Sequence, residues 1–212
     1  MNLIEKEPLF QFIESECNRF NIDESHGLIH SKRCMYYVEL MFEDKNLTDD
    51  EKIVAIYSAA LHDLCDKKYV QIFDSITHIR DWLWLNMLKE EMVEAILSII
   101  QTMSYSYLNQ RRYENGSQWY PDHGKWTKSY HLARNADLLE GYEVGRCYLY
   151  SKRIYPEWKD DQIWKRVEDF FDRRIYKYLS DGWITDPYAI KFAPLLEEKS
   201  RNCFKTRTWE YK

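Results

Sequence analysis

Residues that interrupt helices are scarce along this chain. Its 212 residues include only six glycines and five prolines, and these two types are the strongest local breakers of regular structure. Apolar side chains also recur every three or four residues, as in the first such run of Leu9, Phe12, Ile13, Cys17 and Phe20. That spacing is typical of a helix with one buried face. The sequence therefore predicts an all-α fold.

Local signals locate the first three helices. The first should end near Asn21, and a second should run from about Ser25 to Glu43. The third should begin after Thr48, because Glu51 three residues later gives the spacing of a capping box. It should continue as an apolar helix through "AALHDLC", so that a His-Asp pair emerges directly from a hydrophobic run.

The second half of the chain is also mostly helical in pattern. Asp186 followed by Pro187 suits an N-cap and a first helical position, which predicts the start of a last helix. Aromatic residues at helical spacing in this half are expected in the core or at an interface: Trp164, Phe170, Phe171 and Tyr178. Apolar periodicity predicts further helical segments at 75–88, 90–103, 129–153 and 160–179.

Residues 104–128 interrupt the helical pattern. The segment is polar and aromatic, and it contains Gly116, Pro121 and Gly124. We expect a long loop here, and long loops within compact domains are often functional. Because aromatic rings stack on nucleobases and guanidinium groups pair with phosphates, the loop is a candidate nucleotide-binding lid with Tyr105 as a substrate contact. A well-packed connection is the alternative interpretation.

Composition restricts the class of protein. The formal net charge is −5, from 30 basic and 35 acidic side chains that are mixed along the chain, which argues against an extended nucleic-acid or membrane surface but allows a local basic pocket. Five cysteines with no CxxC spacing favour a reduced, intracellular and cytoplasmic protein. The first twenty residues lack the apolar block of a signal peptide, and no apolar run is long enough to span a bilayer.

Four scattered residues have the chemistry of a metal site: His30, His62, Asp63 and Asp137. Neither side chain of the His62–Asp63 pair is stable when buried without a partner. Two imidazoles and two carboxylates form a mixed shell that suits one divalent ion, with Mn²⁺ as the first choice and Fe²⁺, Co²⁺, Ni²⁺ or Mg²⁺ as alternatives. Such an ion lowers the pKa of bound water and polarises a phosphoryl oxygen. From spacing alone, hydrogen-bonded structural histidines remain the other interpretation.

Three segments of the sequence, in this order along the chain, together resemble those of a known superfamily. They are "SHGLIHSKRC", "AALHDLCDKKY" and "ARNADLLEGYEVGR". Together they resemble the HD-domain metal-dependent phosphohydrolase superfamily over roughly residues 20–150. The resemblance implies a single helical domain over 1–212, with a metal-binding core at about 20–150 and C-terminal helices at 156–205 packed on it. It also implies that His30, His62, Asp63 and Asp137 are the metal ligands.

The resemblance also implies roles for residues near the ligands. Asp66 lies four residues after His62, where it would act as a general acid or base, although a surface carboxylate paired with Lys67 is the alternative. Lys67 and Lys68 would neutralise a phosphate, or else stabilise a helix C-terminus. Both lysines are therefore candidate substrate contacts.

Arg33 and His26 complete the candidate site. Arg33 lies three residues past His30, where it would reach an anion or brace Asp63. His26 matches a family histidine that is not a ligand, so we expect a substrate contact or a capping role. Surface or structural roles are expected for the remaining histidines, which are His78, His123 and His131.

These features predict an enzyme that hydrolyses a phosphate ester or anhydride bond of a nucleotide or a related small phosphorylated metabolite. The alternative is a nucleotide-binding sensor or assembly protein that kept the pocket and has little or no turnover. The four-residue ligand set favours the enzyme, because a retired site has no need of every ligand. A homodimer is left open.

Overall fold

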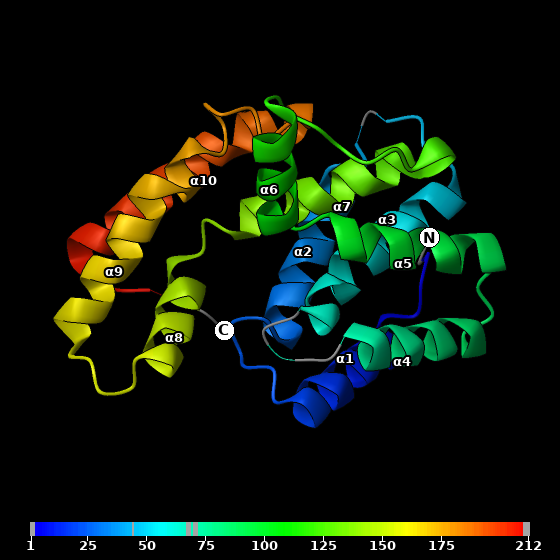
Figure 1. Ribbon diagram of the computed structural model, residues 1–212, viewed down its shortest axis with the longest axis horizontal. Helices are drawn as coiled ribbons and strands as arrows, with labels where there is room; N and C mark the ends of the chain where they lie inside the picture. Colours follow the sequence, from blue (N-terminus) through cyan, green and yellow to red (C-terminus); the bar gives the residue numbers. More distant parts are fainter. Residues whose placement is uncertain (1–2, 44, 67–68, 70–71, 210–212) are drawn as a thin grey trace.

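The computed structural model describes residues 3–43, 45–66, 69 and 72–209. Helices form all of the regular secondary structure in these residues, which confirms the predicted all-α class (Figure 1). The elements are α1 (Lys6–Phe20), α2 (Leu28–Leu40), α3 (Asp49–Leu61), η1 (His62–Cys65), α4 (Ile72–Leu85), α5 (Glu90–Thr102), α6 (Tyr105–Asn115), η2 (Gly124–Trp126), α7 (Thr127–Glu140), α8 (Val144–Ile154), α9 (Asp160–Arg173), η3 (Ile175–Lys177) and α10 (Pro187–Thr206).

Several helix ends follow from local chemistry as predicted. Helix α1 ends at Asn21, which takes the left-handed conformation with φ 52°, a geometry that asparagine tolerates. Both hydrogen bonds of the predicted capping box at Thr48 and Glu51 are present at the start of α3. The Asp186 side chain accepts from two backbone N–H groups at the start of α10, where Pro187 takes the first helical position.

Two predicted helices differ in extent from the expectation. Helix α2 begins only at Leu28, so His26 lies in the turn before the helix and not on it. Helix α3 ends at Leu61, and the His-Asp pair lies in the tighter 3₁₀ turn η1. Such turns are common where an α-helix ends. The pair therefore follows the apolar helix and is not part of it.

The prediction of a long loop at 104–128 is wrong for nearly half of that segment. Residues Tyr105–Asn115 form helix α6, which Ser104 caps by accepting from the Tyr107 N–H and which Gly116 ends at φ 67°. Polar and aromatic residues predominate in this helix, so it has no continuous apolar face, and apolar periodicity did not reveal it. The cap residues at both ends were the signal that was available.

The hydrophobic core lies where α2, α3 and α7 pack against one another. Small side chains on α3 and α7, such as Ala55, Ala59, Ala133 and Ala136, are fully buried there, and they allow the helix backbones to approach closely. Helix α5 packs on α3 and η1, while α8 packs on α9 and α10 on α7. In Figure 1, α8, α9 and α10 lie on one side of the molecule, and α1, α4 and α5 lie on the other.

The predicted segment 129–153 is two helices separated by a short turn. Helix α7 ends at Glu140 and α8 begins at Val144. This turn places Arg146 of α8 beside Glu140 at the end of α7. Within the described residues, every helix is too short or too polar to cross a bilayer.

Candidate metal centre

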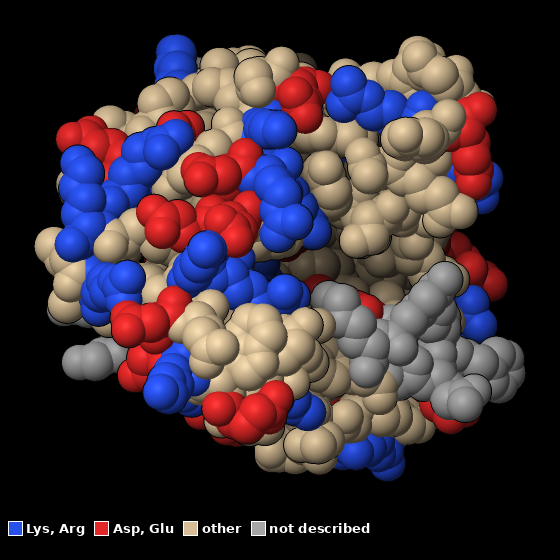
Figure 2. Space-filling view, turned by 60° about the vertical axis from the view of Figure 1, so that its left-hand side comes forward, with Lys and Arg blue, Asp and Glu red and all other residues tan. Residues whose placement is uncertain are grey.

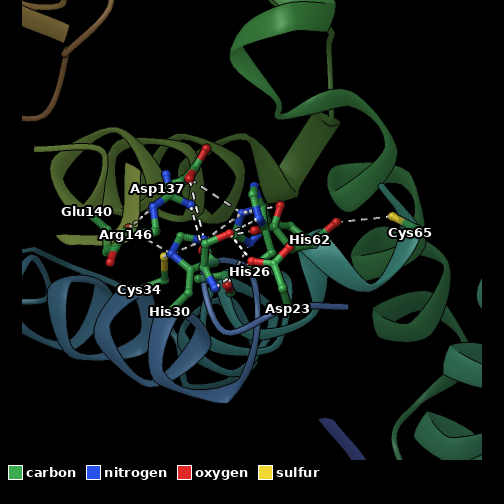
Figure 3. Close-up of polar contacts among 12 residues, drawn as sticks. Asp23, His26, His30, Cys34, His62, Cys65, Asp137, Glu140 and Arg146 are labelled. Atoms are coloured by element: carbon green, nitrogen blue, oxygen red, sulfur yellow. Dashed lines mark hydrogen bonds and ion pairs between the residues drawn. The ribbon is translucent and has the colours of Figure 1, made fainter. Parts of the chain in front are cut away.

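Three core elements bring the four candidate ligands together. Helix α2 supplies His30, η1 supplies His62 and Asp63, and α7 supplies Asp137. His30 is completely buried, and His62 is buried as well. Figure 3 shows the His30, His62 and Asp137 side chains pointing toward one another, with Glu140 and Arg146 on the far side of His30.

The ligand atoms lie within contact distance of one another. The Nε2 atoms of His30 and His62 are 3.3 Å apart. The Asp63 carboxylate places Oδ2 3.1 Å from His30 Nε2 and Oδ1 3.3 Å from His62 Nε2. Asp137 Oδ1 lies 3.7 Å and 3.5 Å from the same two nitrogens. Ligands of one ion bound at about 2.1 Å lie roughly 3–3.5 Å from each other, so these separations suit a shared cation.

The hydrogen bonds of the two imidazoles determine what faces the centre. His30 Nδ1–H donates to Glu140 Oε2 at 2.8 Å, and His62 Nδ1–H donates to the Ala59 carbonyl oxygen at 2.9 Å. In a neutral imidazole the other nitrogen is then an acceptor. Both Nε2 lone pairs therefore face two carboxylates, and the centre consists of acceptors alone.

One buried oxygen tests whether a cation fits this arrangement. Asp63 Oδ2 is buried, and within the described residues it accepts no hydrogen bond of normal geometry, although His30 Nε2 is 3.1 Å away. A buried carboxylate oxygen without a donor is costly. Because its neighbours are acceptors too, a proton or a metal ion is needed among them, and the residues present fit a divalent ion.

The electrostatics of the centre favour positive charge. Burial opposes protonation of His62, but the Asp63 and Asp137 carboxylates outweigh it and raise the pKa of His62 to about 10. Burial likewise disfavours ionisation of Asp137, yet His62 and His30 hold the pKa of that carboxyl well below its usual range. The pKa of Asp63 is lowered for the same reason, against the effect of its burial. Both carboxylates are thus ionised and available to a cation.

Glu140 and Arg146 support His30 from behind, and the sequence interpretation missed both. Glu140 is only 1% exposed, and its Oε2 lies 2.8 Å from both His30 Nδ1 and Arg146 Nε. A carboxylate on the second nitrogen is typical of histidines that bind metals, because it fixes the tautomer and the ring orientation. The available signal was the position of Glu140 three residues after Asp137 on a buried helix.

A buried sulfur lies beside the two histidines. Donor atoms of His30, Cys34 and His62 all lie within 4.8 Å of one another, so these three can hold a metal ion. Cys34 Sγ is 3.6 Å from His30 Nε2 and 3.8 Å from Nδ1. Being nearly equidistant, the sulfur faces the ring and not a nitrogen lone pair. Burial also raises the pKa of the Cys34 thiol well above its ordinary value, so the carboxylates are the better partners for a hard divalent ion.

The remaining predicted residues around η1 are only partly described. Asp66 directly follows η1, is half-buried, and donates its backbone N–H to the Asp63 carbonyl oxygen at 3.2 Å. It therefore lies within one tight turn of a ligand. The two candidate substrate contacts Lys67 and Lys68 lie outside the described residues.

For Arg33, which was expected to reach an anion or to brace Asp63, the structure gives a carboxylate partner beyond the candidate ligands. Its guanidinium pairs with Glu143 in the turn between α7 and α8. Arg33, Tyr37 and Glu140 line a cavity of about 190 Å³ on that side of the molecule. Arg33 lies three residues after His30 on the same face of α2, and its long side chain extends from there to the α7–α8 turn.

His26 lies close to the centre but in a separate hydrogen-bonded group. Its Nδ1 is 2.7 Å from Ser25 Oγ and 3.0 Å from Tyr69 Oη. Both hydroxyls donate to Asp23, so the His26 nitrogen carries a proton. The His26 and His30 rings are 6.3 Å apart. His26 therefore borders the candidate ligands, with its Nδ1 held by Ser25 and Tyr69.

Three other histidines have partners of their own. His78 Nδ1 is 3.0 Å from Glu16, and His123 Nε2 is 3.1 Å from Thr102 Oγ1. His131 packs against Arg134 and the Tyr120 ring. Within the described residues, none of the three contacts the candidate metal centre.

Comparisons with protein-family models, with curated proteins and with solved structures found no match to this chain. Its activity must therefore be inferred from the residues of the centre themselves.

Proposed function

We propose that this chain is an HD-type metal-dependent phosphohydrolase, which cleaves a phosphate ester or anhydride bond of a nucleotide or a related small phosphorylated metabolite. One observation carries the proposal. Two imidazole nitrogens and two ionised carboxylates, brought together from three elements, face one another at distances that suit a shared cation. The order of these residues along the chain is that of the superfamily that the sequence resembles.

One divalent ion would be held by the four residues His30, His62, Asp63 and Asp137. Mn²⁺ is the first choice, and Fe²⁺, Co²⁺, Ni²⁺ and Mg²⁺ are alternatives, because the donor set mixes nitrogen and oxygen. When bound, such an ion lowers the pKa of water and polarises a phosphoryl oxygen.

The chain's own residues would supply the rest of the chemistry. Glu140 and the Ala59 carbonyl oxygen hold the Nδ1 protons of the two histidines, so that both Nε2 atoms stay oriented toward the centre. Asp66 would transfer a proton at the reacting phosphate, since it lies one turn from Asp63. Lys67 and Lys68 would neutralise phosphate oxygens as compact charges.

The test is phosphate or pyrophosphate release across a panel of nucleoside mono-, di- and triphosphates and cyclic nucleotides. Metal-stripped protein would be assayed with each of the five ions added. We expect release only with metal, and loss of release in Asp137→Asn. Asp172→Asn on the exposed surface of α9 is the matched control, and it should retain activity.

Binding without turnover would contradict the proposal. If the protein takes up one metal ion and binds nucleotides, but releases neither phosphate nor pyrophosphate from any of them, the chain is the sensor or assembly protein of the alternative interpretation.

A further inference from the structure

Arg174 differs in its partners from Arg146 and Arg153, two arginines of α8. It lies between α9 and η3 and is half-buried. Arg146 pairs with Glu140, and Arg153 pairs with Asp23. Among the described residues, by contrast, no carboxylate lies within ion-pair distance of Arg174. A partly buried guanidinium that lacks a carboxylate keeps its charge available to an anion from outside the chain.

Aromatic residues hold this guanidinium in place. Arg174 Nε donates to Tyr178 Oη at 2.8 Å, and its guanidinium carbon lies 3.9 Å from the centre of the Tyr105 ring. At that distance the guanidinium stacks on the ring. Within the described residues, its terminal nitrogens form no hydrogen bond, so both remain available as a fork for two oxygens of one phosphate.

The residues that hold Arg174 also border the candidate metal centre. Tyr178 packs against Gly141, where an added Cβ would lie 3.3 Å from Tyr178 Cε2, and Gly141 follows Asp137 by one helical turn. Besides burial, the Asp137 carboxylate raises the pKa of Tyr178, while Arg174 opposes that rise. Tyr178 thus links the two features: its hydroxyl holds Arg174 Nε, and its ring packs against the residue that follows Asp137 by one helical turn.

Tyr105 reaches Arg174 from a different segment of the chain. It begins α6 directly after α5, and the end of α5 packs on η1, where Cys65 Sγ lies 3.9 Å from the Ile100 carbonyl oxygen. In Figure 1, α6 stands between the C-terminal helices and the rest of the bundle. Figure 2 shows lysine and arginine side chains gathered along one side of a hollow in the surface. Anions approaching such a hollow meet positive charge at its edge.

We propose that Arg174, stacked on Tyr105, binds a second phosphate group of the substrate, so that the preferred substrates are nucleoside di- or triphosphates and not monoesters. The inference rests on the proposed function, in which the metal holds the phosphoryl group to be cleaved. A monoester has no further phosphate for Arg174. A phosphoanhydride places one within a few ångströms of the first, and a rigid guanidinium fork matches its oxygens.

The test measures binding and not turnover. Protein loaded with Mn²⁺ would be titrated with imidodiphosphate, whose P–N–P bridge resists hydrolysis, and with orthophosphate. Loss of a charge-assisted hydrogen bond predicts that Arg174→Gln weakens imidodiphosphate binding by about ten- to a hundredfold, with orthophosphate binding nearly unchanged. Arg174→Lys should restore binding only in part, because it keeps the charge without the fork. Arg173→Gln is the matched control, since Arg173 is exposed and donates to the Asp169 carbonyl oxygen.

Two results would overturn the inference: unchanged imidodiphosphate affinity in Arg174→Gln, or an equal loss for both ligands, which would mean a structural role. Since turnover is not the readout, a wild-type protein that fails to release phosphate contradicts the proposed function and leaves this measurement valid. If Arg174→Gln does not fold, Tyr178→Phe removes the hydroxyl that holds Nε while keeping the ring. That variant should bind imidodiphosphate several-fold more weakly. An unchanged affinity would contradict the proposal that Arg174 binds a second phosphate.

Discussion

Helix α7 borders two groups of histidines that have opposite electrostatic surroundings. At Asp137 it faces His30 and His62, where carboxylates raise the pKa of His62 to about 10 against the effect of burial. At His131 the surroundings are Arg134, His123 and aromatic rings. Burial, together with the positive charge of Arg134, lowers the pKa of His131 to about 4.

The comparison shows what makes a buried histidine a candidate ligand. Both groups are withdrawn from solvent, and burial alone disfavours a charged imidazole in each. The groups differ in their charged partners. Two carboxylates stabilise a cation at the first group, whereas Arg134 disfavours one at the second. Only the first group therefore has the chemistry of a metal site.

The largest effect is expected when a candidate ligand is removed from the first group. We expect His62→Ala to reduce the metal content of the purified protein from about one ion per chain to less than about a tenth, because three donors remain where four are needed. His131→Ala is the matched control from the second group and should keep its metal. Elemental analysis of both variants is the measurement. Equal metal content in the two variants would remove the distinction between the groups.

A second prediction separates metal binding from catalysis. Asp66→Asn should leave the metal content unchanged and lower turnover by roughly two to four orders of magnitude, the usual scale for a general acid or base. The measurement is kcat with saturating metal, alongside elemental analysis. Normal turnover in this variant would reduce Asp66 to a surface carboxylate at the end of η1.

The carboxylate behind His30 gives a smaller effect. Glu140→Gln keeps the shape of the side chain but weakens its hydrogen bond to Nδ1, so metal affinity should fall by about ten- to a hundredfold. Glu143→Gln is the control, because Glu143 pairs with Arg33 and does not contact His30. Affinity would be measured by competition with a chelator. A similar loss in both variants would point to a general effect of charge near the α7–α8 turn.

His131 in the second group should make the free energy of unfolding modestly dependent on pH. Because the pKa of His131 falls to about 4 on folding, the unfolded chain takes up its proton first as the pH drops below about 6.5. His131 therefore lowers the free energy of unfolding between about pH 6.5 and pH 4, and has no such effect above that window. His131→Gln should recover about 1 kcal/mol at pH 4.5, a value reduced for partial solvent exposure.

Urea unfolding of the wild type and His131→Gln at pH 7.5 and pH 4.5 checks this expectation. The two proteins should differ by less at pH 7.5 than at pH 4.5. If the difference were the same at both pH values, His131 would not be the group that titrates. His123→Gln tests its neighbour, whose pKa burial also lowers.

Local sequence signals predicted several of the helix ends. The ends of α1, α3 and α10 follow from Asn21, the Thr48–Glu51 capping box and the Asp186–Pro187 pair, because each signal acts over only a few residues. Helix α6 was missed, since its stabilising contacts come from residues distant in the chain. Tyr105, for instance, packs on Tyr178 and Trp183.

The sequence by itself determined an all-helical chain and a set of His and Asp residues with the chemistry to hold a divalent ion. It also contained six histidines, of which the resemblance selected His30, but nothing local gives His30 and His131 different electrostatic surroundings. Tertiary structure decided that difference, by placing Glu140 against a ring 110 residues earlier in the chain and Arg134 against His131. The same holds for Arg174, whose guanidinium lies over Tyr105 only because α6 and the C-terminal segment meet. The pKa of a buried group and its available hydrogen bonds depend on neighbours in space, and those neighbours are set by packing between distant segments.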